Sequence, residues 1–224
     1  MRGRLTPTRA LAIGALAGGA GLLASGLYIP AKAVLAQALL ERAWHKTQAG
    51  ETARPWPWAD ITPVAEIEIP RLHRREIVLE GASGSARAFG PGHMPNTARI
   101  GTEGTAVVAA HRDTQFRYLG KLSKGDRIAA VTADGKRTQF RVVDARVVRA
   151  NASGLDPKDS GPTGARLALV TCYPFSGVFH SPLRYVVIAD RDDEPASYDE
   201  RAARGLSQSP NARSTLPGVP PWRG

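Results

Sequence analysis

The sequence predicts a mainly β protein, an antiparallel barrel or sandwich, that follows one membrane-spanning helix. From residue 62 the chain consists of short apolar or alternating runs separated by Gly, Pro, Asn and Asp, a pattern typical of closely spaced antiparallel strands. Asp134 and Gly135 stand between two such runs, which indicates a hairpin. Near the N-terminus, the uncharged stretch 10–31 is long enough to cross a bilayer as a helix.

Charged residues flank this uncharged stretch. Three arginines precede it and a lysine follows it, so the positive-inside tendency predicts that residues 1–9 lie in the cytoplasm and the rest of the chain outside it. We expect residues 10–31 to be retained as a signal anchor that contacts membrane lipid. The alternative is a cleaved signal peptide, because Ala31 and Ala33 have the spacing of a cleavage site.

Residues 32–61 are expected to form a membrane-proximal helix and a linker. Leu35, Leu39 and Leu40 fall on one helical face, which predicts an amphipathic helix. In the following "ETARPWPWAD", the prolines end the helix. The linker tryptophans, Trp56 and Trp58, would either rest at the membrane interface or cover one end of the domain.

The folded domain is expected over residues 62–190 and a disordered tail over 191–224. Two segments of the domain have helical patterns, "SGSARAFG" and "DTQFRYLGKL". In the second, apolar residues recur every third position, so Phe116 is expected in the core. The tail is rich in charge, Ser, Pro and Gly, a composition that cannot bury a face.

The net charge of +10 raises the question of nucleic-acid binding. The arginines are scattered, however, and the sequence has no basic block with interleaved aromatics and no zinc-finger spacing, so we expect no nucleic-acid partner. It also has no Cys/His/carboxylate cluster at metal-ligand spacing, and we expect no metal and no cofactor.

The only cysteine in the chain, Cys172, ends the run "RLALVTC". A single cysteine forms no intramolecular disulfide, so it is either a buried inert thiol or a reactive one. Strand alternation places Leu167, Leu169 and Thr171 on one face and Ala168, Val170 and Cys172 on the other. Pro174 cannot donate to a central ladder, so pairing should end just past Cys172, at a rim open to substrate.

Two further residues stand at strand ends. His111 follows the apolar run "TAVVAA", and Arg184 begins the apolar run "RYVVIAD". A cysteine acts as a nucleophile in its thiolate form and needs a base or a cation nearby, and acyl transfer needs a cation for the developing oxyanion. The three residues together indicate covalent acyl transfer. His93, in "GPGHMPN", lies on a loop that could border the cleft.

Four motifs give the chain a resemblance to a known family. "FGPGHMPNT", "AHRDTQF", "ALVTCYPF" and "SPLRYVV" stand in the order and at the approximate spacing found in sortases, which are membrane-anchored cysteine transpeptidases. The resemblance covers residues 62–190 and implies a closed eight-stranded β-barrel with short helices. Further sequence segments, such as "KAVLAQALLERAW", are similar to those of the class GN sortases of Gram-negative bacteria.

The resemblance implies roles for particular residues. Cys172 would attack the carbonyl of a C-terminal sorting signal of a secreted protein, and His111 would serve as acid and base. Arg184 would hold the substrate carbonyl and the oxyanion. Thr171, His93 and Ala168 would border the substrate groove. Ala168 replaces the Thr that is usual in the family, and Ala110 replaces the usual Gly, so we expect changed local packing with the chemistry retained.

The resemblance also implies partners and a location. The thioacyl enzyme would pass its acyl group to an amine acceptor at the cell envelope. The protein would be a single-pass protein of the inner (cytoplasmic) membrane with its catalytic domain on the periplasmic side. Two alternatives remain: a thiol peptidase that releases the acyl group to water, and a non-catalytic membrane-tethered barrel that binds surface proteins with Cys172 as a packed thiol.

Overall fold

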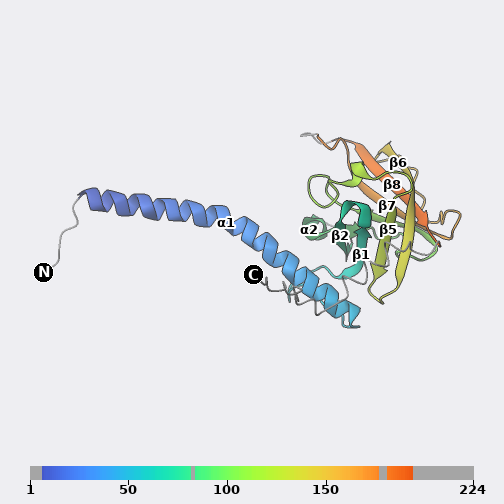
Figure 1. The fold of residues 1–224 in the computed structure, drawn as a ribbon, viewed down its shortest axis with the longest axis horizontal. Helices are drawn as coiled ribbons and strands as arrows, with labels where there is room; N and C mark the ends of the chain where they lie inside the picture. Colours follow the sequence, from blue (N-terminus) through green and yellow to red (C-terminus); the bar gives the residue numbers. More distant parts are fainter. Residues whose placement is uncertain (1–6, 82–83, 177–180, 194–224) are drawn as a thin grey trace, which may run out of the picture. The chain divides into compact units, whose positions relative to one another are not determined.

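The computed structural model describes residues 7–81, 84–176 and 181–193 of the 224-residue chain. Within these ranges the chain forms two α-helices, two 3-10 helices and eight β-strands (Figure 1). The helices are α1 (Pro7–Gln48), η1 (Pro70–Leu72), α2 (Gly84–Phe89) and η2 (Leu119–Lys121). The strands are β1 (Pro63–Ile69), β2 (Arg74–Glu80), β3 (Gly92–His93), β4 (Gly104–Ala109), β5 (Arg127–Thr132), β6 (Arg137–Arg149), β7 (Ala165–Cys172) and β8 (Leu183–Arg191).

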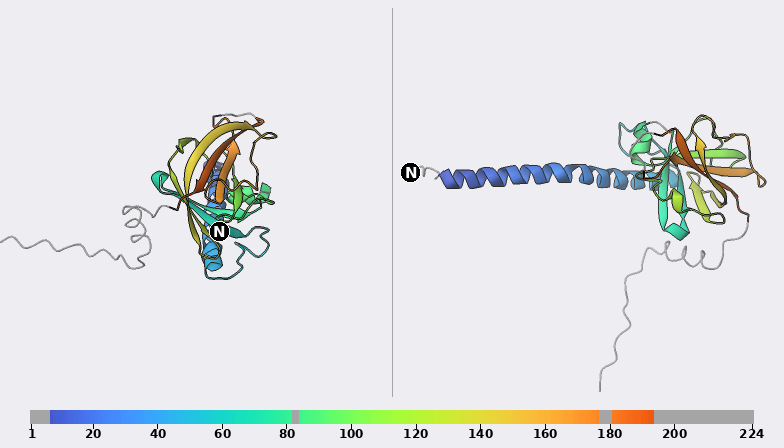
Figure 2. Two further views of the ribbon diagram at one scale, coloured as in Figure 1. Left: turned by 90° about the vertical axis from the view of Figure 1, so that its right-hand side faces the viewer. Right: turned by 90° about the horizontal axis from the view of Figure 1, so that it is seen from above.

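The strands close into a barrel in the order β1-β2-β3-β4-β7-β8-β6-β5, and Figures 1 and 2 show them wrapped around a common interior. Of the two architectures that the sequence left open, the structure has the barrel. Two neighbouring pairs are parallel, β2 with β3 and β4 with β7, and the others are antiparallel. The parallel β4–β7 pair brings the ends of two strands that are distant in sequence to the same rim.

Each of the expected apolar runs is a strand, and the eighth strand is the short β3, Gly92–His93, in a segment expected to be a loop. Gly92 pairs with Leu79 of β2 and with Ala109 of β4, so β3 links these strands and completes the barrel. The expected hairpin joins β5 and β6, with Gly135 at φ +78, a conformation that glycine adopts at little cost.

The core fills the barrel interior. Its fully buried side chains include Ile67, Val108, Phe116, Phe140 and Leu167, so the expected burial of Phe116 is confirmed. The segment 113–122, however, is not an α-helix: turns extend through Tyr118, and only Leu119–Lys121 forms a 3-10 helix. An apolar repeat of every third residue matches the three residues per turn of such a chain of turns.

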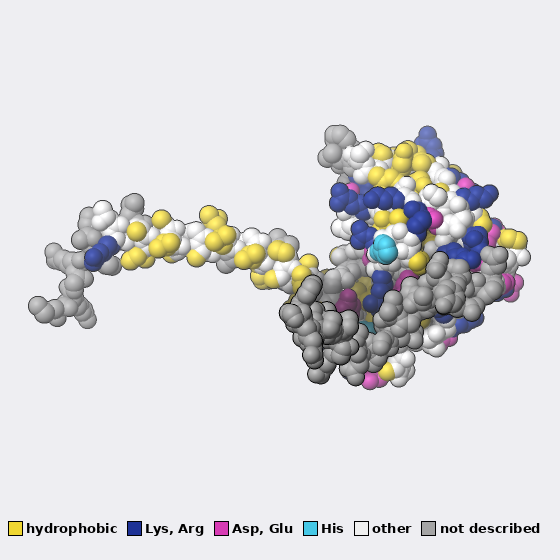
Figure 3. Space-filling view, viewed as in Figure 1, with side chains coloured by type: hydrophobic (Ala, Val, Ile, Leu, Met, Phe, Trp, Pro, Cys, Tyr) yellow, Lys and Arg dark blue, Asp and Glu magenta, His cyan; other side chains and the backbone are white. Residues whose placement is uncertain are grey.

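The first helix, α1, is continuous from Pro7 to Gln48 and passes through Pro30 (Figure 2). The anchor helix and the membrane-proximal helix expected from the sequence are therefore parts of one helix. From Ala12 onward it is apolar and long enough to cross a membrane. Apolar side chains such as Leu16 and Leu22 are exposed along it (Figure 3), which is the surface that a bilayer favours.

The C-terminal part of α1 packs on the outside of the barrel. Leu40 and Trp44 are almost fully buried in a cluster with Ile77 and Leu79 of β2. The side-chain amide of Gln37 donates a hydrogen bond of 2.9 Å to the carbonyl oxygen of Phe89. Leu35, expected on the packed face, is instead 59% exposed, so the docking face begins later along the helix.

The two linker tryptophans have different environments. Trp56 packs edge-on against Phe89, with ring centroids 4.9 Å apart, and it contacts the cluster beneath α1. Trp58 is 82% exposed. Of the two linker tryptophans, only Trp56 therefore covers part of the domain. Of the tail expected over 191–224, residue 191 ends β8 and residues 194–224 lie outside the described part of the chain.

Candidate functional site

The three residues of the candidate site stand at or near strand ends: Cys172 ends β7, Arg184 lies at the start of β8, and His111 follows the end of β4 by two residues. Cys172 at the end of β7 is the direct antiparallel register partner of Arg184 at the start of β8. In the parallel β4–β7 pair, Ala109 is opposite Val170, and the Ala110 amide donates to the Val170 carbonyl at 3.2 Å. Continued by two residues past the end of β4, this register would bring the backbone of His111 level with Cys172.

Cys172 and its register partner Arg184 lie on the outer face of the barrel. Ala165, Leu167 and Leu169 belong to the interior core, so the alternation of β7 directs Cys172 outward, on the face opposite Leu167 and Leu169 as the sequence predicted. Cys172 and Arg184 are half-buried, and His111 is exposed. Each of the three residues is therefore at least partly accessible to solvent.

Arg184 is held by carbonyl groups close to it in sequence. Its Nη1 donates to the carbonyl oxygens of Ser181 at 2.9 Å and of Leu183 at 2.8 Å. Within the described ranges, no carboxylate pairs with this guanidinium. The positive charge beside Cys172 is therefore oriented without being neutralised, which suits a group that binds a developing oxyanion.

Three aromatic rings fix the chain just beyond Cys172. Tyr173 stacks on Tyr185 with ring centroids 6.2 Å apart, and Phe175 meets both rings edge-on. The Tyr173 amide donates to the Leu183 carbonyl at 3.1 Å, and the peptide bond between Tyr173 and Pro174 is cis. Burial, and then the neighbouring Tyr173 and Asp144, raise the pKa of Tyr185, so its hydroxyl is protonated near neutral pH.

Thr171 and Ala168 precede Cys172 on β7, by one and by four residues. The Thr171 side chain is buried, and its hydroxyl donates to the Ala110 carbonyl at 2.8 Å, so it faces away from the outer surface. Ala168 is fully buried on the same face as Cys172, with Val107 and Ile188 as register partners. Their proposed part in a substrate groove stays a prediction.

His93 lies in a different environment. It is 8% exposed, and its Nε2 donates to the Ala98 carbonyl at 2.8 Å. Its register partner is Val108, a residue of the interior core. His93 lines a cavity of about 710 Å³ together with residues of β1, β2 and β5, and none of the three candidate catalytic residues lines that cavity. The structure does not group His93 with them, and its expected role in the groove stays a prediction.

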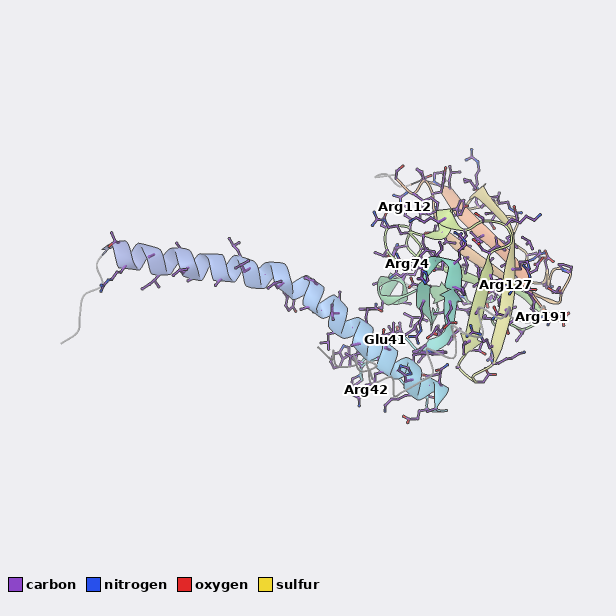
Figure 4. All side chains as sticks on the ribbon, in the orientation of Figure 1. Glu41, Arg42, Arg74, Arg112, Arg127 and Arg191 are labelled. Atoms are coloured by element: carbon purple, nitrogen blue, oxygen red, sulfur yellow. The ribbon has the colours of Figure 1, made fainter. Side chains whose placement is uncertain are left out.

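Arg112 is a residue near the site whose position could not be predicted from the sequence. It follows His111, and its Nη1 donates to the Pro174 carbonyl at 2.8 Å. It lies between β4 and η2 and is labelled in Figure 4. The only signal in the sequence was its place in "AHRDTQF".

In the described part of the chain, no three His, Cys, Asp or Glu side chains form a metal-binding group, and the absence of a metal requirement stays a prediction.

Comparison with known proteins places this chain in a family. The family model described as "Sortase domain" matches residues 67–192, more than half of the chain and nearly the whole barrel. The curated relative Sortase D from Bacillus subtilis (strain 168) is 30% identical over 125 residues. These residues are 56% of this chain and 62% of the relative, so the chain covers less than two thirds of that relative's length.

Solved structures of sortases share the fold. The Sortase D5 transpeptidase of Clostridium perfringens superposes with a TM-score of 0.55 at 20% identity, over 71% of this chain and 99% of that chain. The SrtA sortase from Actinomyces oris gives a TM-score of 0.52 at 26% identity, over 58% of this chain and 79% of that chain. The closed barrel is therefore common to this chain and to sortases of different classes.

Proposed function

Because the chain belongs to the sortase family, we propose that it is a cysteine transpeptidase in which Cys172 is the nucleophile. The observation that carries this proposal is the register pairing of Cys172 with Arg184, next to the parallel strand β4 that ends two residues before His111. A nucleophile, a proton-transfer group and an oxyanion-binding cation are the three functions that acyl transfer needs.

In the first half of the reaction, the sulfur of Cys172 attacks the carbonyl carbon of a peptide bond in the sorting signal. The carbonyl oxygen becomes an oxyanion, which Arg184 stabilises through N–H groups not used in its bonds to Ser181 and Leu183. When the C–N bond breaks, His111 gives the leaving amine the proton that it took from the thiol group of Cys172. The products are a thioacyl enzyme and the released C-terminal segment.

In the second half, an amine attacks the thioacyl carbonyl. His111 removes a proton from the incoming nitrogen, the C–S bond breaks, and the thiol group of Cys172 is regenerated as the new amide forms. The partners are thus a secreted protein with a C-terminal sorting signal and an amine acceptor at the cell envelope. Water in place of the amine would make the same site a thiol peptidase.

The proposed location follows from α1. The helix anchors the protein in the inner membrane of a Gram-negative bacterium by a single span, and the basic residues before the span keep the N-terminus in the cytoplasm. The barrel then lies on the periplasmic side. The resemblance of the sequence to class GN sortases supports a location in a Gram-negative bacterium. In such a cell envelope, the amine acceptor need not be peptidoglycan.

The full chain in detergent tests the activity. It is incubated with peptides from the C-terminal regions of proteins secreted by the same organism, with and without an added amine, and the products are identified by mass spectrometry. A ligated product supports the transpeptidase, cleavage without ligation supports the peptidase, and absence of both supports a binding module.

Matched variants assign the three roles. Cys172→Ala, His111→Gln and Arg184→Gln should each remove the product. Two substitutions provide controls, His73→Gln at an exposed turn and Arg149→Gln on the neighbouring β6, and both should leave product formation unchanged. Full activity of any of the first three variants would contradict the role given to that residue.

A further inference from the structure

Arg112 connects the two segments that leave the candidate site. Its Nη1 donates a hydrogen bond of 2.8 Å to the carbonyl oxygen of Pro174, 62 positions later in the sequence. Arg112 directly follows His111, and Pro174 lies two residues beyond Cys172. The bond therefore links the backbone just after His111 to the backbone just after Cys172, the two residues of the proposed proton transfer.

The environment of Arg112 makes this bond strong. Its side chain is 11% exposed, so little water competes for the donor, and a charged donor strengthens a hydrogen bond to a carbonyl group. Its Nε also lies 3.5 Å from Oδ1 of Asp113, whose side chain is 72% exposed. An ion pair so exposed contributes little, whereas the bond to Pro174 is shorter and joins two segments that are distant in sequence.

A second contact joins the same two segments farther along. A Cβ atom built on Gly120 would lie 2.8 Å from Cε2 of Phe175, closer than van der Waals contact allows. The segment from His111 to Gly120 thus touches the segment after Cys172 both near its beginning and near its end. Phe175 in turn packs against Tyr185, which follows Arg184 on β8.

We propose that Arg112 is a positioning residue that aligns His111 with Cys172 by holding the Pro174 carbonyl. The inference rests on the proposed function, because it gives Arg112 a task in a reaction assigned to its neighbours. Arg112 acts through the backbone on either side of the reacting groups. Since a displacement of about 1 Å in a reacting group can lower a rate about 100-fold, loss of this bond should affect the chemical step more than substrate binding.

Three substitutions separate positioning from general stability. Arg112→Met removes the charge and the donor, Arg112→Lys keeps both in a shorter group, and Arg117→Met removes an exposed arginine from the same segment. We expect Arg112→Met to lower kcat at least about tenfold with KM changed less than about twofold. Arg112→Lys should recover part of kcat, and Arg117→Met should match the wild type, as should Asp113→Asn.

A measurement without peptide substrate keeps this inference distinct from the proposed function. The rate at which iodoacetamide alkylates Cys172 is followed against pH in the full chain, because that rate reports the thiolate and its coupling to His111. Arg112→Met should shift this pH profile, whereas Arg117→Met should not. If the wild type cleaves no peptide, the proposed function fails, but the alkylation profiles still test the alignment.

Gly120→Ala provides a second variant in case Arg112→Met does not fold, which circular dichroism would detect. The added methyl group displaces Phe175 without changing any charge and should produce the same fall in kcat and the same kind of shift in the alkylation profile. The inference is overturned if folded Arg112→Met has the kcat and the alkylation profile of Arg117→Met. It is equally overturned if Arg112→Met does not fold and Gly120→Ala behaves as wild type.

Discussion

The hydroxyl of Thr171 donates a hydrogen bond of 2.8 Å to the carbonyl oxygen of Ala110. Thr171 precedes Cys172 and Ala110 precedes His111, so this bond joins β7 to the end of β4 one residue before the proposed nucleophile and base. The interaction is buried. It sets the spacing between the two backbones where the chemistry is proposed to occur.

Replacing Thr171 by valine should therefore destabilise the protein. The shape is retained, but the Ala110 carbonyl loses a buried donor, a change that typically costs about 1–3 kcal/mol. Thr171→Ser keeps the hydroxyl and should keep most of the stability. Urea unfolding of both variants measures the difference, and a valine variant as stable as the serine variant would show that the hydrogen bond contributes nothing.

The alternation of short runs was sufficient to predict the strands and the faces of β7. Inward Leu167 and Leu169 and outward Cys172 follow from the period of two. The strand-end positions of His111 and Cys172 also followed from the sequence, because each apolar run stops there. That these ends meet at one rim depends on the parallel pairing of β4 with β7, which the sequence did not predict because its short runs indicated antiparallel strands.

Glu76 predicts a pH dependence of stability. This β2 residue is the register partner of Ile67, a core residue, and burial raises the pKa of its carboxyl from 4.5 to about 7 despite the opposing charge of Arg74. Between these two values the folded state keeps a proton that the unfolded state has released. Raising the pH from about 4.5 to about 7 should therefore lower the stability, by at most about 3 kcal/mol.

The variant Glu76→Gln removes this titration. It should be about as stable as the wild type near pH 4.5 and more stable at pH 8, because above the folded-state pKa the wild type carries the full cost of a buried charge. Glu80→Gln, at an exposed position of the same strand, is the control. Free energies of unfolding measured from pH 4 to pH 8 test the prediction, which fails if the two variants have parallel profiles.

The docked end of α1 predicts where the chain can be shortened. A chain that begins at residue 33 keeps Leu40 and Trp44 on the barrel, whereas one that begins at residue 50 loses both and exposes Ile77 and Leu79. Burial of two such side chains contributes about 3 kcal/mol or more. Thermal unfolding should show a lower Tm for the shorter chain and for Trp44→Ala in the longer one. Equal Tm values would mean that the docked helix does not stabilise the barrel.

Ala168 stands where the sortase family usually has threonine, and a substitution can test the effect of this difference. The side chain is fully buried between Val107 and Ile188, so Ala168→Thr adds atoms to a packed site and should cost about 1–3 kcal/mol. Because Ala168 lies four residues before Cys172 on the same face, the chemistry should persist. Calorimetry and single-turnover rates together check this, and a stable variant that lacks activity would show that the alanine is needed for the reaction itself.

Other features depended on contacts between distant side chains and could not be predicted from local patterns. The leucines on one face of the helix suggested a packed face beginning at Leu35, but the barrel contacts Leu40 and Trp44. The position of β2 decides which residues of the helix pack against the barrel. Similarly, nothing local in "AHRDTQF" indicates that Arg112 reaches Pro174. The segment after His111 resembled a helix because its repeat of three also fits successive turns.

The central claim is that Cys172 forms a thioacyl intermediate. The full chain in detergent is mixed with a peptide that contains the sorting signal, quenched in acid before an amine is added, and digested for tandem mass spectrometry. The N-terminal fragment of the peptide should be found on Cys172, and the adduct should disappear when amine is added and be absent from Cys172→Ala. Peptide cleavage that leaves Cys172 unmodified throughout, or that persists in Cys172→Ala, would contradict the proposed mechanism.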